Sequence, residues 1–192
     1  KELIVRVSPP VHVISGVALD GYLSASAVTF TSVSGNFTKV TTTDANGSFQ
    51  LECSGDEFNA TDSNANGLLD AQEGFITVRG GIDGTTNETF GASLAADANS
   101  TVVTPLTTIL NALVQEGLSK TEAQSALSLS FGYSNQVDLT HYDPIRAAGE
   151  GDENAKQILK SGSIAINLIK QAEAFSSIAS PNLEHGAVGL SV

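Results

Sequence analysis

The segment from Asp62 to Glu73 carries the residue types and the spacing of a calcium-binding loop. Its sequence, DSNANGLLDAQE, satisfies the pattern D-x-[DN]-x-[DN]-G-x5-E at every constrained position. Calcium takes about six to eight oxygen ligands at roughly 2.3–2.6 Å, supplied by carboxylates, amides and carbonyls. The segment therefore predicts a Ca2+ site with six ligands: Asp62, Asn64, Asn66, the Leu68 carbonyl, Asp70 and Glu73.

Each position of this calcium loop has a physical role. Gly67 permits the sharp turn, and Glu73 can close the shell with both carboxylate oxygens. Leu69 is expected to point inward as an apolar anchor. A metal-free turn is the alternative, since Asp, Asn and Gly are ordinary turn formers, but the number of matched positions favours calcium. No amphipathic helix is expected before Asp62 and a strand-like run follows Glu73, so a calmodulin-like opening switch is not expected.

The first half of the chain, residues 1–100, must supply the strands that position this loop. Short alternating apolar runs separated by turn residues predict these strands. The expected strands are Val17–Leu19, Leu23–Phe30, Thr38–Thr42, Ser48–Glu52 and Phe75–Arg79. Asp44-Ala45-Asn46-Gly47 predicts a tight turn between two of them. We expect this half to form an antiparallel β-sandwich-like unit.

The second half changes to a helical period. Four helices are expected, beginning after the N-cap residues Thr104, Ser119, Asp143 and Asp152. The predicted fold class is α+β, with an antiparallel β-sandwich-like N-terminal half followed by a helical C-terminal half. The predicted organisation is a single domain over residues 1–192, mainly β over 1–100, mainly helical over 101–180 and irregular over 181–192.

Composition limits the classes of partner. The chain has 192 residues and a formal net charge of −12, which disfavours nucleic acid and anionic membrane surfaces as partners. The longest apolar run, near Ile164–Ile169, is too short to insert through a bilayer. Cys53 is the only cysteine, so an intramolecular disulfide and a cysteine-based zinc site are excluded, and we expect it to be buried. The chain begins at Lys1, and we expect neighbouring domains of a larger protein.

No enzyme signature is found. The sequence contains no G-x-S-x-G elbow, no H-E-x-x-H, no P-loop and no G-x-G-x-x-G. The three histidines, His12, His141 and His185, are scattered, and we expect each to be structural or on the surface. Asp143 beside His141 is explained as a helix cap because Pro144 follows it. The sequence therefore predicts a protein that is not an enzyme.

Four short phrases carry a resemblance to a known family. They are Val17–Leu23, Thr43–Phe49, Ser100–Thr108 and Asp138–Pro144. Together they resemble the peptide-binding module near the ligand-binding end of large repeats-in-toxin adhesins of Gram-negative bacteria, over roughly Val17 to Phe175. The resemblance implies a secreted or cell-surface location, calcium that supports the fold and ligand binding, and a peptide or protein ligand on another cell. It transfers no ligand-contact residue.

Two other readings stay open. One is a carbohydrate-binding or dockerin-like module of a secreted polysaccharide-degrading protein, although a dockerin usually carries two such loops and one is evident here. The other is a structural spacer stiffened by calcium. The absence of Trp and the presence of only three Tyr favour a peptide over a sugar ligand. We expect a ligand carboxylate to complete the calcium shell, and a binding groove where the sheet loops meet the helical half.

Overall fold

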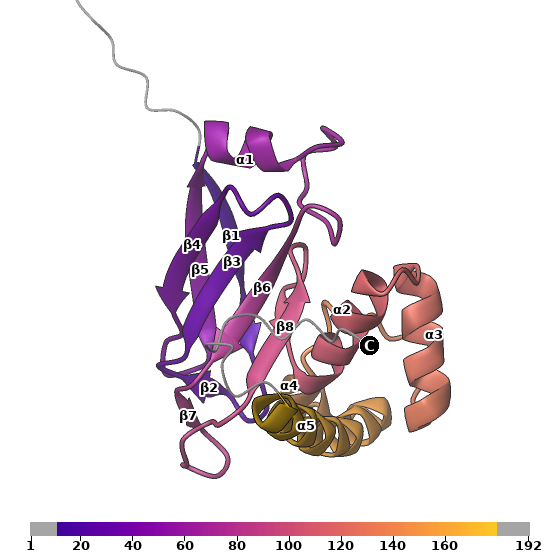
Figure 1. Cartoon of the computed structure of the whole chain (residues 1–192). Helices are drawn as coiled ribbons and strands as arrows, with labels where there is room; N and C mark the ends of the chain where they lie inside the picture. The colour runs from indigo at the N-terminus through magenta and orange to yellow at the C-terminus, as the bar shows by residue number, and fades with distance from the viewer. Residues whose placement is uncertain (1–10, 180–192) are drawn as a thin grey trace, which may run out of the picture.

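The computed structural model describes residues 11–179, so the tail predicted over 181–192 lies outside the described residues. Along this range the strands come first and the helices second, with a single short helix, α1 (Gly55–Thr61), inserted among the strands. The predicted α+β class is confirmed. Figure 1 shows the strands on one side of the molecule and the later helices gathered beside and below them.

The strands form two principal sheets and a small ribbon. The larger sheet has the order β4–β3–β6–β8, with β4 (Thr38–Thr42), β3 (Ala27–Ser32), β6 (Gly74–Arg79) and β8 (Ser93–Asp97) all antiparallel. The second has the order β5–β1–β9, with β5 (Ser48–Ser54), β1 (Val11–Ala18) and β9 (Val102–Val103). The ribbon pairs β2 (Leu23–Ser24) with β7 (Ile82–Asp83).

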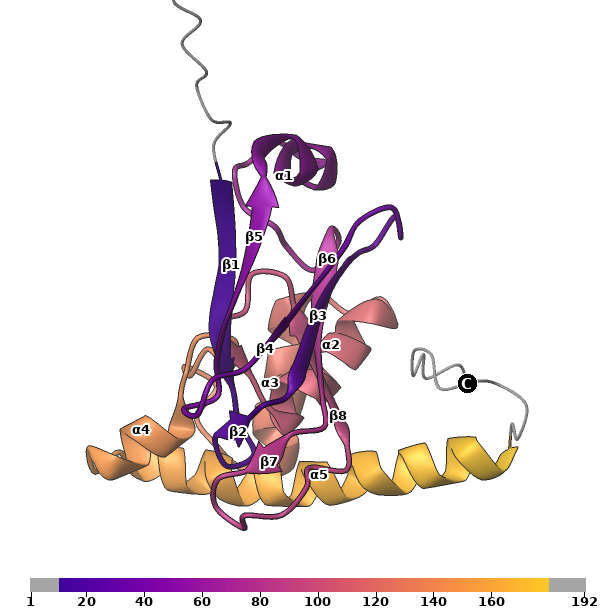
Figure 2. The ribbon, with the colours of Figure 1, turned by 90° about the vertical axis from the view of Figure 1, so that its left-hand side faces the viewer.

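The two principal sheets face each other across a shared apolar core, as the alternating pattern predicts (Figure 2). Along β5, the alternate residues Phe49, Leu51 and Cys53 point inward and are buried. Phe30 and Ile76, from neighbouring strands of the other sheet, are fully buried in the same core. The expected sandwich is therefore present, and Cys53 is buried as expected.

Two details of the strand predictions were wrong. The sandwich is not wholly antiparallel, because β1 pairs with β9 in parallel. The expected strand Leu23–Phe30 is split into β2 and β3 at Ala25, whose φ of 53° interrupts the extended backbone. Ser26 then donates its N–H to Thr43 Oγ1 at 2.8 Å, so the interruption is bonded to the neighbouring turn rather than to a strand partner.

The helices of the second half begin where their caps predict. They are α2 (Pro105–Gln115), α3 (Lys120–Phe131), α4 (Pro144–Gly149) and α5 (Glu153–Ala179). Thr104 and Ser119 each form a capping box, accepting a backbone N–H with the side-chain hydroxyl. Asp143 caps α4 by accepting from the N–H groups of Ile145 and Arg146. These side chains satisfy backbone donors that the first helical turn leaves unpaired.

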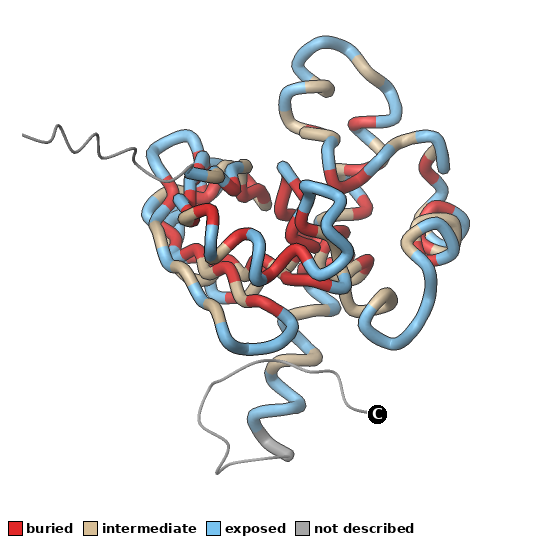
Figure 3. Tube along the Cα trace, turned by 90° about the horizontal axis from the view of Figure 1, so that it is seen from above, coloured by how far each residue is buried: buried red, intermediate tan, exposed pale blue. Residues whose placement is uncertain are grey.

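The helical layer is attached to the sandwich by α2 and α5. Thr107 Oγ1 on α2 donates to the Ala95 carbonyl of β8 at 3.0 Å. Ile166 of α5 enters the sandwich core, whereas Ile158 of the same helix enters a second apolar cluster with α2 and α3. Figure 3 shows the buried positions gathered inside the body of the molecule, while α5 is exposed over residues 174–177. The helix α5 therefore joins the two apolar clusters.

Candidate functional site

The predicted calcium loop lies between a helix and a strand. α1 ends at Thr61, Asp62 is its C-cap residue, and β6 begins at Gly74 directly after Glu73. The strand after the loop is confirmed, whereas the expectation of no amphipathic helix before Asp62 was wrong, because α1 buries Gly55, Phe58 and Thr61. The helix has only two turns, too few for a helical period to show in the sequence. A capping box formed by Ser54 and Glu57 is the signal that could have revealed it.

The first half of the loop curls around its own carboxylate. Asp62 accepts the N–H of Asn66 at 3.1 Å and the N–H of Gly67 at 2.8 Å, one on each oxygen. Asn64 Oδ1 accepts from the Asn66 N–H at 3.0 Å, and Asn66 Oδ1 accepts from the Leu68 N–H at 2.8 Å. Gly67 has a φ of +82°, the conformation for which glycine was expected at this turn.

The second half of the loop is closed by Glu73, which is buried with 4% of its surface exposed. Its Oε1 accepts from Ser63 N–H at 2.6 Å and from Asn64 N–H at 3.1 Å, and its Oε2 accepts from Asp70 N–H at 3.2 Å. Glu73 therefore connects the last position of the loop to the second and third. Leu69 is buried with 5% exposed, so its predicted role as the apolar anchor is confirmed.

The loop concentrates negative charge without a basic partner. Asp62 and Glu73 are buried, Asp70 is half-buried, and none of the ion pairs of the described residues involves them. Buried carboxylates are costly unless hydrogen bonds, counter-charges or metals compensate them. The Leu68 residue is 56% exposed, and Asn64 and Asn66 are also exposed, so one side of the loop faces solvent.

The donor set fits a hard cation, since it consists of three carboxylates, two amides and one carbonyl. Within residues 11–179, however, no three acidic, histidine or cysteine side chains converge into a ready metal cage. The three carboxylates Asp62, Asp70 and Glu73 are instead held by backbone N–H groups. Asp70 also accepts from the Asn64 amide at 2.9 Å, and Glu73 from the Ser63 hydroxyl at 2.9 Å. The loop curls as predicted. A bound calcium ion would draw its ligand oxygens closer together.

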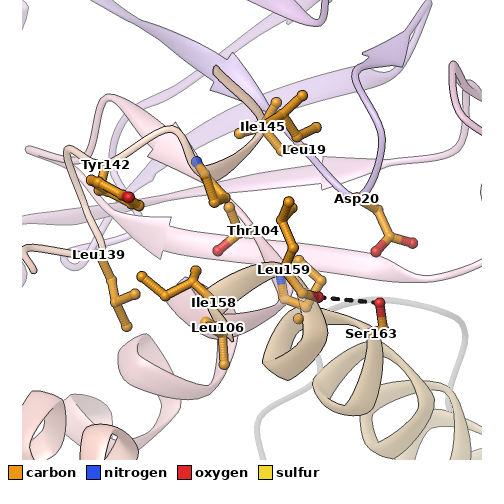
Figure 4. A pocket seen from close by; sticks show the side chains of 13 residues that line it. Leu19, Asp20, Thr104, Leu106, Leu139, Tyr142, Ile145, Ile158, Leu159 and Ser163 are labelled. Carbon is orange, nitrogen blue, oxygen red and sulfur yellow. Dashed lines mark hydrogen bonds between the residues drawn. The ribbon is translucent and has the colours of Figure 1, made fainter. Parts of the chain in front are cut away.

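A cleft lies at the junction between the sheet loops and the helices, where a groove was expected (Figure 4). Its floor is formed by buried aliphatic side chains: Leu19, Leu106, Leu139 and Ile158. Tyr142 borders it and donates its hydroxyl to Asp152 at 2.7 Å; burial and the Asp152 carboxylate raise the pKa of this tyrosine. The enclosed volume is only about 20 Å³, so the cleft is shallow.

Helix α2 connects the cleft to the calcium loop. Its N-terminal residues Thr104, Pro105 and Leu106 line the cleft. At its other end, the Gln115 side-chain amide donates to the Ala71 carbonyl of the loop at 3.4 Å. A helix of this length spans about 16 Å, so the two regions are separate sites joined by one rigid element. In Figure 1, α1 lies at the upper end of the sandwich and α4 and α5 cross its lower end.

The described histidines have structural contacts. His12 stacks on Phe58 of α1 with ring centroids 3.9 Å apart. His141 Nδ1 lies 3.0 Å from Asp138 Oδ2 and 2.9 Å from Thr140 Oγ1, so both contacts use the same ring nitrogen.

The chain matches no family model, no curated protein and no solved structure. The resemblance to repeats-in-toxin adhesin modules thus rests on the four sequence phrases and stays a prediction. No helix in the described part of the chain combines the length and apolarity that a bilayer crossing requires.

Proposed function

We propose that this protein is a calcium-dependent binding module of an extracellular bacterial adhesin and that it recognises a peptide or protein ligand on another cell. The observation that carries the calcium part is the Asp62–Glu73 loop, in which buried carboxylates lie in a turn without a basic partner. The six predicted ligands, Asp62, Asn64, Asn66, the Leu68 carbonyl, Asp70 and Glu73, would hold the ion. Bound calcium would supply positive charge to an acidic loop.

The residues of the chain prepare the loop for this ion. Glu73 ties the end of the loop to its beginning, and Leu69 anchors its centre in the sandwich core. The solvent-exposed side at Leu68 leaves room for a ligand next to the ion. A peptide carboxylate is the expected ligand group there, because calcium reverses the sign of an otherwise repulsive surface of net charge −12. Secretion would place the loop where calcium is abundant.

Bound calcium would also influence the cleft indirectly, through α2. The Gln115–Ala71 contact joins the loop to α2, whose first residues line the cleft. Ordering of the loop would stabilise the position of this helix. The proposal therefore includes two ways for calcium to support binding, a direct one at the loop and an indirect one through α2.

The structure bears on the sugar-binding alternative through its tyrosines. Tyr133 is buried with 6% exposed, and Tyr22 and Tyr142 are half-buried with both hydroxyls donated to carboxylates. Exposed aromatic faces are the usual platform for sugar rings, and these three residues do not offer one. The strand β6 after the calcium loop also differs from the second helix of a helix–loop–helix calcium motif. A peptide ligand is therefore favoured.

The first experiment tests calcium binding. Thermal melts in calcium and in chelator should differ by several degrees, since a ligand at 100 times its Kd stabilises by about 2.7 kcal/mol. The Asp62→Ala/Glu73→Ala variant should lose this difference, whereas Asp56→Asn, at an exposed carboxylate on nearby α1, should keep it. Identical wild-type melts in the two buffers would contradict the proposal.

The second experiment tests ligand recognition. Fluorescence polarisation with a library of peptides ending in a free carboxylate, and with the same peptides amidated, should show calcium-dependent binding of the free acids. A glycan array run in parallel tests the sugar reading. Calcium-dependent stability without peptide or glycan binding would support the spacer and reject the binding module.

A further inference from the structure

The cleft has one carboxylate, that of Asp20, at its edge. Asp20 is half-buried at the edge of the cleft, and no hydrogen bond or ion pair reaches its side chain from the described residues. Two more deeply buried aspartates do have partners: Asp83 accepts the Thr85 N–H at 2.7 Å, and Asp97 pairs with Lys120 at 3.1 Å. An unpaired carboxylate in partly apolar surroundings is the kind of group that a ligand would satisfy.

The position of Asp20 is determined by a tight turn. Leu19 and Tyr22 form an isolated β-bridge around Asp20 and Gly21. Gly21 packs so closely on Asp83 and Thr85 that a side chain there would collide with both. The turn therefore cannot shift toward this loop, and Asp20 is held at the cleft.

Figure 4 shows how the cleft is arranged. Asp20 lies at one end, Tyr142 lies toward the other, and aliphatic side chains such as Leu159 and Ile145 lie between them. Among the described residues that line the cleft, Asp20 is the only charged one. The cleft thus combines an apolar channel with a negative end.

Two charged groups act on Asp20 from neighbouring elements. Burial raises the pKa of Asp20, the Asp83 carboxylate raises it further, and Lys170 on α5 opposes them. Lys170 makes no ion pair with Asp20 and lies over the Phe90 ring, with 6.0 Å from its nitrogen to the ring centroid. An additional cation at Asp20 would therefore relieve an unfavourable interaction that Lys170 relieves only in part.

We infer that the cleft receives a lysine side chain of the ligand, with the ammonium on Asp20 and the aliphatic stem along Leu159 and Ile145. This inference rests on the proposed function, because it assumes that the ligand is a peptide or protein. A lysine has a four-carbon stem and a compact ammonium, so its stem can lie across the half-buried Leu159 and Ile145 at the surface of the cleft while the ammonium reaches the carboxylate. The guanidinium of arginine could also pair with both oxygens of this carboxylate, but it is wider than an ammonium, and the small enclosed volume of the cleft favours the more compact group.

The test is an NMR titration of the isotope-labelled full chain with the peptide Ac-Gly-Lys-Gly-NH2. We expect a Kd on the order of 1–10 mM, with shifts at Asp20, Leu159 and Ile145. The same peptide with an acetylated lysine keeps the stem but loses the charge, and it should bind about tenfold more weakly. Asp20→Asn should weaken the unmodified peptide by a similar factor, whereas Glu52→Gln, at an exposed carboxylate on β5, should not.

Further variants, peptides and buffer conditions in the same titration separate the competing explanations. Lys170→Gln should tighten binding, since it removes the resident cation that acts on Asp20. Equal affinity for the acetylated peptide, unchanged affinity in Asp20→Asn, or no shift at the cleft would overturn the inference. Equal or tighter binding of an arginine peptide would overturn the assignment to lysine. Because the titration is run in calcium and in chelator, loss of the calcium effect alone would count against the proposed function and not against the lysine site.

Discussion

The carboxylates of the calcium loop and of the cleft differ in their hydrogen bonding. In the loop, Asp62 and Glu73 have both oxygens bonded to N–H groups that lie within the same segment. In the cleft, no donor from residues 11–179 reaches Asp20, although the surrounding segments come from both halves of the chain. Hydrogen bonds within the segment compensate the loop carboxylates, whereas the described residues supply none to the carboxylate of the cleft. Sites that bind ligands often retain such a local cost.

The largest effect is expected at the centre of the loop. Glu73→Ala removes the acceptor for the N–H groups of Ser63, Asn64 and Asp70, and it empties a buried position. We expect the free energy of unfolding to fall by about 2–4 kcal/mol even in chelator. Urea unfolding in chelator and in calcium would measure the structural and the metal contributions separately.

Glu73→Gln is the matched control for that experiment. It keeps one carbonyl oxygen as an acceptor and the volume of the side chain, so it should cost less than Glu73→Ala in chelator. It should nevertheless lose most of the response to calcium, because it removes the charge. If the two variants lose equal stability in chelator, the hydrogen bonds of Glu73 do not hold the loop together.

The contrast also explains what the sequence could predict. The loop could be recognised because its ligands, its turn glycine Gly67 and its anchor Leu69 all lie within one segment with a fixed spacing. The N-caps Thr104, Ser119 and Asp143 were predictable for the same reason, since a cap and its partner are three residues apart or fewer. Features that depend only on neighbouring residues can therefore be predicted from short sequence patterns.

Features that depend on distant segments could not be predicted. The parallel pairing of β1 with β9 joins residues more than eighty positions apart, and no local pattern specifies it. The role of Asp20 likewise depends on α2, α4 and α5 closing around the turn. The short helix α1 was missed for another reason, because two turns of helix show no clear period and tertiary contacts of Phe58 support it.

Two glycines sharpen the comparison further. Gly21 borders the cleft, where a side chain would collide with Asp83 and Thr85, so Gly21→Ala should destabilise by about 1–3 kcal/mol through overpacking. Gly67 has open space around it but a positive φ, so Gly67→Ala should cost about 1–2 kcal/mol through backbone strain. Thermal unfolding of both variants would measure these losses.

A further readout tells the two mechanisms apart. Gly67→Asn should recover most of the loss at the loop, since asparagine tolerates this conformation, while Gly21→Asn should recover nothing. Recovery at Gly21 would mean that its close contacts with Asp83 and Thr85 do not fix the turn that holds Asp20.

A smaller effect is expected at the start of α1. Ser54→Ala removes the hydroxyl that accepts the Glu57 N–H at 3.3 Å, and loss of such an N-cap costs about 1 kcal/mol. Because α1 leads directly into Asp62, calcium affinity should also fall by a few-fold. Ser54→Thr, which preserves the hydroxyl, is the control for isothermal titration with calcium. An unchanged calcium affinity in Ser54→Ala would show that the loop forms independently of its helix.

The smallest effect is expected at Asp20, where ionisation of the carboxyl group lowers the free energy of unfolding. Burial and the neighbouring Asp83 raise the pKa of Asp20 above its value of 3.8 in an unfolded chain. The native state therefore holds this proton to a higher pH than the unfolded state does, so the free energy of unfolding decreases as pH rises from 3.8 through the folded pKa. Above the folded pKa this loss of stability is complete, and it persists at neutral pH.

Asp20→Asn should remove this loss. The variant should therefore be slightly more stable than the wild type at pH 7 and equal to it near pH 3, where the wild-type carboxyl is protonated in both states. Urea unfolding of both proteins at the two pH values measures the difference, in which the titration of all other groups largely cancels. If the variant is less stable at pH 7, the Asp20 charge already has a stabilising partner such as Lys170, and the cleft would have no unsatisfied group for a ligand. If Asp20→Asn is more stable at pH 7 and also binds the lysine peptide more weakly, the Asp20 carboxylate both destabilises the fold and recognises the ligand.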